Sequence, residues 1–190
     1  MELLSGVFSA FGLSASAGLN AYIPLLTISL LAKFTDLIEL TKPWDVLTSW
    51  WIIGLLVVLL AIEIIADKVP AVNHVNDVIQ TIVRPAAGAI VFAASAKVIS
   101  DVHPILAMAA GILVAGSVHA VKSGAIRPAV TATTGGAGNV PVSILEDILS
   151  TITSILAILI PVLIGLLILL LLILITYWMW KRSHRAQPTT

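Results

Sequence analysis

Two short segments of this chain carry hydroxyl, amide and glycine residues within an otherwise very apolar sequence. The first contains Ser14, Ser16 and Asn20 and ends near Pro24. The second runs from Arg127 to Pro141 and contributes Thr131, Thr133, Thr134, Gly135, Gly136 and Asn139. Glycine and proline interrupt a helix and free backbone N–H and C=O groups. Such groups, with the side-chain oxygens, coordinate ions and polar solutes in transporters, so we predict a substrate or ion path here.

The same residues have a simpler interpretation, which is close packing. Small and hydroxylated residues let membrane helices approach each other and hydrogen-bond across their contact. The residue types alone leave both interpretations open.

Glu63 lies inside an uncharged apolar stretch, and Asp67 follows one turn later on the same helix face. A charge within a membrane costs about 2.5–3.5 kcal/mol on insertion scales, so an ionisable group there needs a partner, water or a proton. We therefore predict that Glu63, with Asp67, couples or gates transport. The alternative is that Glu63 lies near a helix end and reaches the headgroup region.

Basic residues and one histidine mark the ends of several apolar stretches: Lys68, Arg84, His119, Lys122 and Arg127. We expect this charged cluster at the cytoplasmic face, as an entry vestibule, a network of paired charges or a site for anionic lipid headgroups. Basic residues at helix ends are also ordinary interfacial anchors, which is the alternative interpretation.

Composition and motifs argue against several classes of function. Cysteine is absent, which removes disulfides and thiolate chemistry. His74 with Asp77, and His119 with Lys122, lack a third metal ligand nearby. The glycine run at 135–138 lacks the Lys-Ser/Thr of a phosphate loop. We therefore expect no metal, no cofactor and no enzymatic activity, and a formal net charge of zero gives no basic surface for nucleic acid.

The composition is that of an integral membrane protein. Of the 190 residues, 59% are hydrophobic and 11% are charged, and the mean hydropathy is +1.09. Soluble domains average about 45–50% apolar and about 25% charged residues. Glu2 stands where a signal peptide would carry a basic residue, so we expect the first apolar segment to be retained. We predict one all-α, polytopic membrane domain over residues 1–190.

The apolar stretches predict the helices that position these residues. The first span is expected at about 3–32, with an interruption at 18–24. Further spans are expected at about 49–66, 84–99, 104–121 and 162–180, and the stretch from 127 is expected to be a second interrupted span. Apolar residues at spacings of three and four predict that 67–84 is an amphipathic helix on the membrane surface. Pro161 is expected to interrupt the long uncharged stretch around it. Residues 181–190 are expected to form a polar cytoplasmic tail.

Counts of lysine and arginine favour about six spans over five. Six spans place both termini in the cytoplasm, with seven basic residues on that side against three, whereas five spans give six against four. The positive-inside rule therefore favours six, with 3–32 and the stretch from 127 as the two interrupted helices. Five spans, in which the second segment does not cross, remain the alternative.

Three motifs together resemble an uncharacterised bacterial membrane family, domain of unknown function 4126. The motifs are Gly18-Leu19-Asn20-Ala21-Tyr22-Ile23-Pro24, Glu63-Ile64-Ile65-Ala66-Asp67-Lys68-Val69-Pro70, and the run from Arg127 to Asn139. The resemblance covers most of the chain up to about residue 150. It implies a polytopic bacterial membrane protein and supplies no activity or substrate.

We therefore expect a small transporter or channel-like protein of the bacterial inner membrane, with a polar path between the two interrupted helices and possible coupling to protons or ions. Its expected partners are the lipid bilayer, an unknown small solute or ion, and further copies of itself. The small-residue faces of 84–99 and 104–121 would form such a homo-oligomer. The alternatives are a non-transporting membrane scaffold or assembly subunit and a lipid-headgroup-handling flippase or enzyme.

Overall fold

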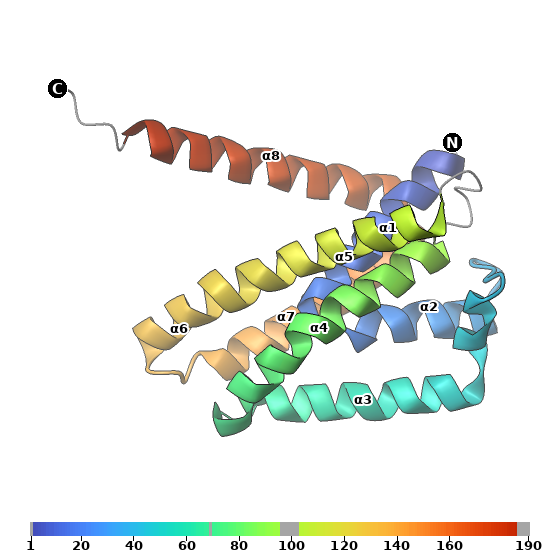
Figure 1. Ribbon diagram of the computed structural model, residues 1–190, viewed down its shortest axis with the longest axis horizontal. Coiled ribbons are helices and arrows are strands. Elements are labelled where there is room, and N and C mark those ends of the chain that lie inside the picture. Colours follow the sequence, from blue (N-terminus) through green and yellow to red (C-terminus); the bar gives the residue numbers. More distant parts are fainter. Residues whose placement is uncertain (1, 69, 96–102, 186–190) are drawn as a thin grey trace.

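The computed structural model describes residues 2–68, 70–95 and 103–185, and its elements there are all helical (Figure 1). The α-helices are α1 (Glu2–Leu19), α2 (Tyr22–Phe34), α3 (Trp50–Lys68), α4 (Pro70–Ser95), α5 (Pro104–Val121), α6 (Arg127–Thr134), α7 (Asn139–Leu159) and α8 (Pro161–Arg185). A 3₁₀ turn, η1 (Trp44–Thr48), precedes α3, and a π-helical turn, η3 (Lys122–Ile126), joins α5 to α6. The predicted all-α class is confirmed.

Within the described residues, four helical stretches are long and apolar enough to cross a membrane. They are Trp50–Lys68, Val75–Ser95, Pro104–Thr134 and Asn139–Leu159. The protein is therefore a multi-pass membrane protein. The predicted number of six spans is not confirmed, because the two stretches expected to be interrupted spans fold in other ways.

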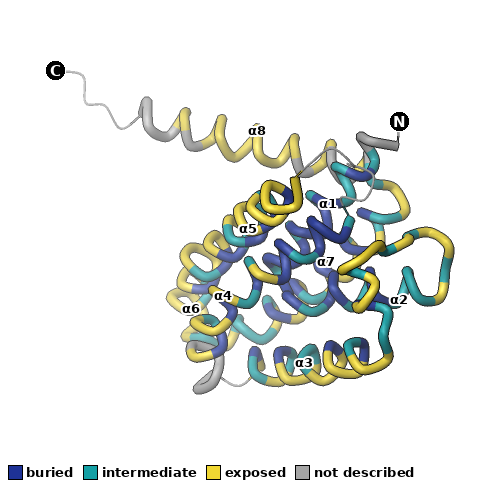
Figure 2. The backbone as a smooth tube through the Cα atoms, turned by 45° about the vertical axis from the view of Figure 1, so that its right-hand side comes forward, coloured by how far each residue is buried: buried dark blue, intermediate teal, exposed yellow. Residues whose placement is uncertain are grey.

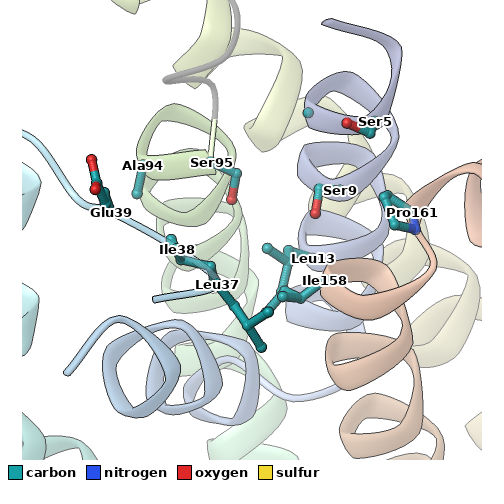
Figure 3. A pocket seen from close by; sticks show the side chains of 11 residues that line it. Ser5, Ser9, Leu13, Leu37, Ile38, Glu39, Ala94, Ser95, Ile158 and Pro161 are labelled. Atoms are coloured by element: carbon teal, nitrogen blue, oxygen red, sulfur yellow. The ribbon is translucent and has the colours of Figure 1, made fainter. Parts of the chain in front are cut away.

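The first predicted span forms two helices that fold back on each other instead of one interrupted crossing. α1 ends at Leu19, and the side-chain oxygen of Asn20 accepts the backbone N–H groups of Tyr22 and Ile23 at the start of α2. Ser5 of α1 and Leu37, just after α2, line the same pocket, so the pair enters and leaves at one end of the bundle (Figures 1 and 3). The break itself lies within 18–24, where the sequence places it.

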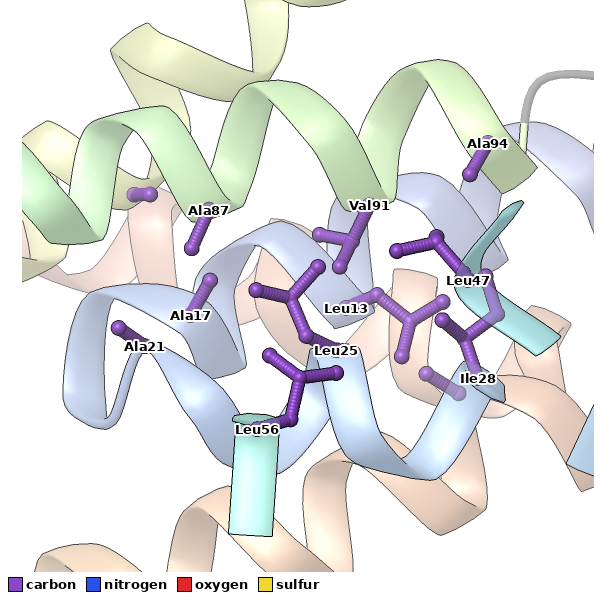
Figure 4. Packing of buried hydrophobic residues seen from close by; sticks show 12 residues of the cluster. Leu13, Ala17, Ala21, Leu25, Ile28, Leu47, Leu56, Ala87, Val91 and Ala94 are labelled. Carbon is purple, nitrogen blue, oxygen red and sulfur yellow. The ribbon is translucent and has the colours of Figure 1, made fainter. Parts of the chain in front are cut away.

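Helix α1 occupies the centre of the bundle. It packs against α2, α4, α5, α7 and the start of α8, and much of it is fully buried (Figure 2). Leu13 and Ala17 meet Leu25 and Ile28 of α2, together with Ala87 and Val91 of α4, in the main apolar core (Figure 4). The pair formed by α1 and α2 therefore supplies many of the residues of the apolar core.

The glycine run at 135–138 is a turn between two helices and not a break within one crossing. α5, η3 and α6 form a continuous helical stretch that ends at Thr134, and α7 runs back along the bundle from Asn139 (Figure 1). Gly135 and Gly136 have φ values of 62° and 91°, in the left-handed region that ends a helix and favours glycine. The predicted crossing from 127 is thus divided between the end of one helix and the start of the next.

Two prolines that could have ended helices are instead accommodated inside them. Pro85 lies within α4, so residues 70–84 of the predicted surface helix are continuous with the next predicted span, whereas Asp67 and Lys68 end α3. Pro128 follows the π-helical turn, in which the Arg127 N–H donates to the carbonyl of Lys122, five residues back. A π turn changes the local hydrogen-bond register next to a residue that has no N–H to donate.

The side chains of α4 show why its amphipathic half does not lie on the membrane surface. Asn76, Gln80 and Arg84 are buried, whereas Val78 and Ile82 are exposed. The polar face therefore points into the protein and the apolar face points outward. This orientation suits lipid, which cannot satisfy polar groups.

Small residues bring α4 and α5 into close contact. A Cβ atom added at Gly111 would overlap the carbonyl oxygen of Gly88, and one added at Gly88 would overlap the side chain of Ala115. The small-residue faces that we expected to form a homo-oligomer are therefore used within the chain. An oligomer through these faces is not supported.

The predicted interruption at Pro161 is confirmed, because α7 ends at Leu159 and α8 begins at Pro161. Beyond its first turns α8 extends away from the bundle, with exposed leucines along its length (Figures 1 and 2). Figure 1 places the start of α1 and the end of α8 at opposite ends of the long axis, so the expectation that both termini are cytoplasmic is not confirmed. The tail from 186 to 190 lies outside the described residues.

Candidate functional site

Seven charged side chains and one histidine meet inside the bundle and form what we call the charge network. They come from α3, α4, α5, η3, α6 and α7: Glu63, Asp67, Asp77, Arg84, His119, Lys122, Arg127 and Glu146. Arg84 is 0% exposed, and Lys122 and Glu63 are each 1% exposed. Among charged residues such burial is uncommon, and in a membrane it marks a functional candidate.

One part of the network is centred on Arg84. Its Nη2 donates to Glu63 Oε1 at 2.9 Å, and its Nη1 lies 3.2 Å from His119 Nδ1. Because a guanidinium only donates, Nδ1 of His119 must accept, which places the ring proton on Nε2. His119 Nε2 then donates to the Thr81 hydroxyl at 3.2 Å. The geometry thus holds His119 in the neutral form.

The other part is centred on Arg127 and Lys122. Arg127 Nη2 lies 2.8 Å from Asp67 Oδ2 and 3.2 Å from Glu146 Oε2, and Nη1 lies 3.6 Å from Asp77 Oδ1. Lys122 Nζ lies 2.7 Å from Glu146 Oε2 and 3.9 Å from Asp67 Oδ2. Neutral groups complete the shell of Asp67, which accepts hydrogen bonds from Asn76 at 2.7 Å and Ser143 at 3.1 Å.

The end of α1 is joined to both parts of the network. Arg84 Nη1 lies 3.4 Å from the Gly18 carbonyl oxygen, and Lys122 Nζ donates to the Leu19 carbonyl oxygen at 3.0 Å. The last carbonyls of a helix have no partner within it and carry the negative end of the helix dipole. Two buried cations therefore satisfy the carbonyls that the break in α1 exposes.

A line of hydroxyl groups runs along α1 on the side facing α7, and we call it the serine seam. The Ser16 hydroxyl lies 2.7 Å from both the Ser150 and the Ser154 hydroxyls, and Ser9 donates to the Ala157 carbonyl. Asn20 donates to Asp147 at 2.9 Å at the end nearer the charge network. Ser16, Ser150 and Ser154 are fully buried, so the seam is closed in this conformation.

A groove of about 740 Å³ opens at the end of the bundle where α6 turns into α7. Thr131, Gly135, Gly136 and Asn139 line it, and Arg127 and Asp77 of the charge network reach its wall. The groove therefore leads directly to the network. Thr133 and Thr134 are not among its lining residues, and their hydroxyls donate to carbonyls of their own helix.

A second, smaller pocket of about 190 Å³ lies at the opposite end (Figure 3). Ser5 and Ser9 of α1, Glu39, and Ser95 at the end of α4 line it. Leu13 closes its inner wall and is fully buried in the core. The pocket thus reaches Ser9 at the end of the serine seam, and Leu13 lies between it and Ser16 along α1.

The structure brings together part of the predicted site and separates the rest. Glu63 and Asp67 meet Arg84, His119, Lys122 and Arg127, while Lys68 is exposed and lies outside the network. Ser14 donates to the Gly88 carbonyl at 2.9 Å. Among the described residues, no hydrogen bond joins Ser14, Ser16 or Asn20 to the polar residues of 131–139. The polar side chains of the α1 segment pair with α4, through Ser14, and with α7, through Ser16 and Asn20.

Sequence reasoning found Arg84 but missed Asn76 and Gln80 of α4 and the polar residues of α7. Asn76, Gln80 and Arg84 recur every four residues on α4. Ser143, Glu146, Ser150 and Ser154 recur at three or four residues on α7, and all four are buried. A polar stripe of helical period in an apolar segment is the signal that would have found them, because in lipid such a stripe must face inward.

Comparison with known proteins confirms the resemblance drawn from the motifs. The family model described as domain of unknown function (DUF4126) matches residues 7–182, which covers all the helices that form the site. No curated protein and no solved structure matches the chain.

Proposed function

We propose that this chain, which belongs to the DUF4126 family of unknown function, is a small membrane transporter or channel for an ion or small polar solute. The observation that supports this function best is the charge network, which is buried among apolar helices and opens to a groove at one end. Ionisable groups inside a membrane are costly and are found mainly along ion and substrate pathways.

The path we propose follows α1. It leads from the groove through the charge network to Asn20 and Asp147, then along the serine seam to Leu13 and the second pocket. Asp77 and Ala94, which line the two openings, are about 25 Å apart along α4 at about 1.5 Å per residue, close to the thickness of a hydrocarbon core. Openings at both ends and a closed middle suit a protein that exposes one site alternately to each side.

Flux into liposomes tests this function. Purified protein is reconstituted into liposomes that enclose a dye sensitive to protons, sodium or potassium, and glycerol-driven swelling reports a small neutral solute. The native chain should raise at least one of these fluxes several-fold above empty liposomes. Asp77→Asn should lower it, because it removes the carboxylate at the junction of groove and network. Fluxes equal to those of empty liposomes for every probe would contradict the proposal.

Two further variants sharpen this experiment. Lys68→Gln is the matched control, because its side chain is exposed, follows Asp67 directly and lies outside the network; its flux should equal that of the native chain. Leu13→Ala should increase leak, because Leu13 lies between the second pocket and Ser16 of the serine seam. Unchanged leak would show that Leu13 is not the barrier.

The scaffold alternative is supported by one observation, the exposed and leucine-rich length of α8 that extends beyond the bundle. Another membrane chain could pack along it. This function would be favoured by a partner that copurifies with the whole chain at fixed stoichiometry and is lost when the chain is truncated after Pro161, if neither form of the chain shows flux. The headgroup-binding alternative has less support, because Arg127 at the groove already faces three carboxylates.

We further propose a location in the bacterial inner membrane and assembly as a homo-oligomer. The second proposal now needs a surface other than the α4–α5 contact. Crosslinking in native membranes, compared between the whole chain and one truncated after Pro161, tests whether copies associate and whether α8 is needed.

A further inference from the structure

The charge network contains one more acidic group than basic groups. The acids are Glu63, Asp67, Asp77 and Glu146, and the bases are Arg84, Lys122 and Arg127. His119 is neutral because its Nδ1 accepts from Arg84. With every carboxyl ionised, four negative charges minus three positive charges leave one negative charge in a buried, apolar surrounding.

We infer that the network binds one proton and that Glu63 is the carboxyl that takes it. The inference rests on the proposed function, for which it names the coupling ion. A bound proton brings the network to neutrality, which removes the cost of an unpaired charge in a medium of low dielectric constant.

The geometry opposes other occupants. An anion would meet Arg127, whose guanidinium already faces Asp67, Glu146 and Asp77. A metal ion needs several converging ligands, and no three acidic or histidine side chains among the described residues are arranged to hold one. A proton needs a single carboxyl oxygen with room for a hydrogen.

Glu63 has the least support as an anion. Asp67 accepts from Arg127, Asn76 and Ser143, and Glu146 is held by both Lys122 and Arg127. Asp77 is the most exposed of the four, with 19% of its side chain accessible. Glu63 is 1% exposed and has Arg84 as its one ion-pair partner among the described residues. Its Oε2 has no hydrogen-bond partner, and neither has Oε1 of Glu146, whose Oε2 is held by two cations.

The groups that surround Glu63 come from several elements. Tyr22 of α2, Asp67 of its own helix, Arg84 of α4 and Lys122 of η3 act on it electrostatically. Glu146 of α7 faces Lys122 rather than Glu63. A proton on Glu63 weakens its attraction for Arg84 and leaves that cation to His119 and the Gly18 carbonyl. Proton binding is thereby linked to the contact that holds the end of α1.

Infrared spectroscopy of the protein in liposomes tests the inference without measuring transport. A protonated carboxyl has a C=O stretching band that ionised carboxylates lack. pH-difference spectra of the native chain should show one such buried carboxyl. Its band should shift when glutamate is labelled with ¹³C and stay unchanged when aspartate is labelled.

Charge-conserving variants then identify the residue. In Glu63→Asp the band should become sensitive to labelled aspartate, whereas in Glu146→Asp it should stay sensitive to labelled glutamate. A band that stays glutamate-sensitive in Glu63→Asp, or that is sensitive to aspartate in the native chain, or that is missing at every pH, overturns the inference. A band on Glu63 without any flux leaves the inference standing and contradicts transport. Flux without the band supports transport and overturns the inference.

Discussion

Removing the guanidinium of Arg127 should destabilise the bundle by several kcal/mol. Its Nη2 lies 2.8 Å from Asp67 and 3.2 Å from Glu146, and its Nη1 lies 3.6 Å from Asp77. Arg127→Met keeps much of the aliphatic length but leaves these carboxylates with Lys122 as their nearest cation, and the formal charge of the network changes from minus one to minus two. Removing one partner of a buried pair costs about 3–5 kcal/mol.

A double-mutant cycle separates this effect from lost packing. Asp67→Asn with Arg127→Met restores the formal charge to minus one, so the double variant should be more stable than Arg127→Met alone. We expect a coupling of about 2–3 kcal/mol, at the upper end for residues in one network. Thermal unfolding in detergent at mildly basic pH measures it, at about 2–4 °C per kcal/mol for a chain of this size.

Lys68→Met is the control for the loss of a basic residue. Its side chain is exposed, so its effect should stay within about 0.5 kcal/mol. Two results would refute the reasoning: a cost of less than about 1 kcal/mol for Arg127→Met, as for an exposed ion pair, or effects that simply add in the double variant.

The remaining predictions concern glycines, each with a matched control. Gly111→Val should destabilise the protein by about 1–3 kcal/mol in thermal unfolding, because its Cβ would overlap the backbone of Gly88, whereas Gly54→Val, where nothing lies within 4 Å, should be nearly neutral. Gly135→Ala should cost about 1–2 kcal/mol in the same assay, because its φ of 62° is unfavourable for a residue with a side chain. The control Gly124→Ala, where nothing lies within 4 Å of the added Cβ, should not destabilise the protein. Equal effects of the two substitutions in either pair would contradict the explanation.

The sequence located the interruptions of helices better than the path of the chain after them. Proline and glycine act on their own backbone, so breaks at 18–24 and at Pro161 follow from local chemistry. The direction after a break depends on what the next segment packs against. α2 turns back because Leu25 and Ile28 bury against α1 and α4, a contact between segments up to about sixty residues apart that no local pattern contains.

The amphipathic segment 67–84 was predicted to lie on the membrane surface, whereas the structure buries its polar face. A helix with one polar and one apolar face can lie on a membrane with the polar face in water, or stand inside it with the polar face buried. Periodicity is the same in both cases. What decides is whether other helices offer partners, and Glu63 and His119, which contact Arg84, lie on elements outside that segment.

The charged residues of the site were found individually, but their pairing was not. Arg84, Lys122 and Arg127 each stand next to an apolar stretch, which is also where interfacial anchors stand. Their burial depends on Glu63, Asp67 and Glu146 arriving from other helices. Glu146 was not among the predicted site residues, although it belongs to the polar stripe that continues through Ser150.

The break in α1 and the charge network are parts of one arrangement. The carbonyls of Gly18 and Leu19 have no partner within their helix, and lipid offers none. Arg84 and Lys122 donate to them, and these cations in turn need Glu63 and Glu146. A shift of α1 along its axis must therefore disturb both ion pairs, and neutralising either acid must change how firmly the cations hold α1. Because coupling between two such events is reciprocal, a proton on Glu63, which leaves Arg84 to the Gly18 carbonyl, favours whichever position of α1 holds Arg84 more tightly. That relation gives a buried acid a physical means of changing the position of α1.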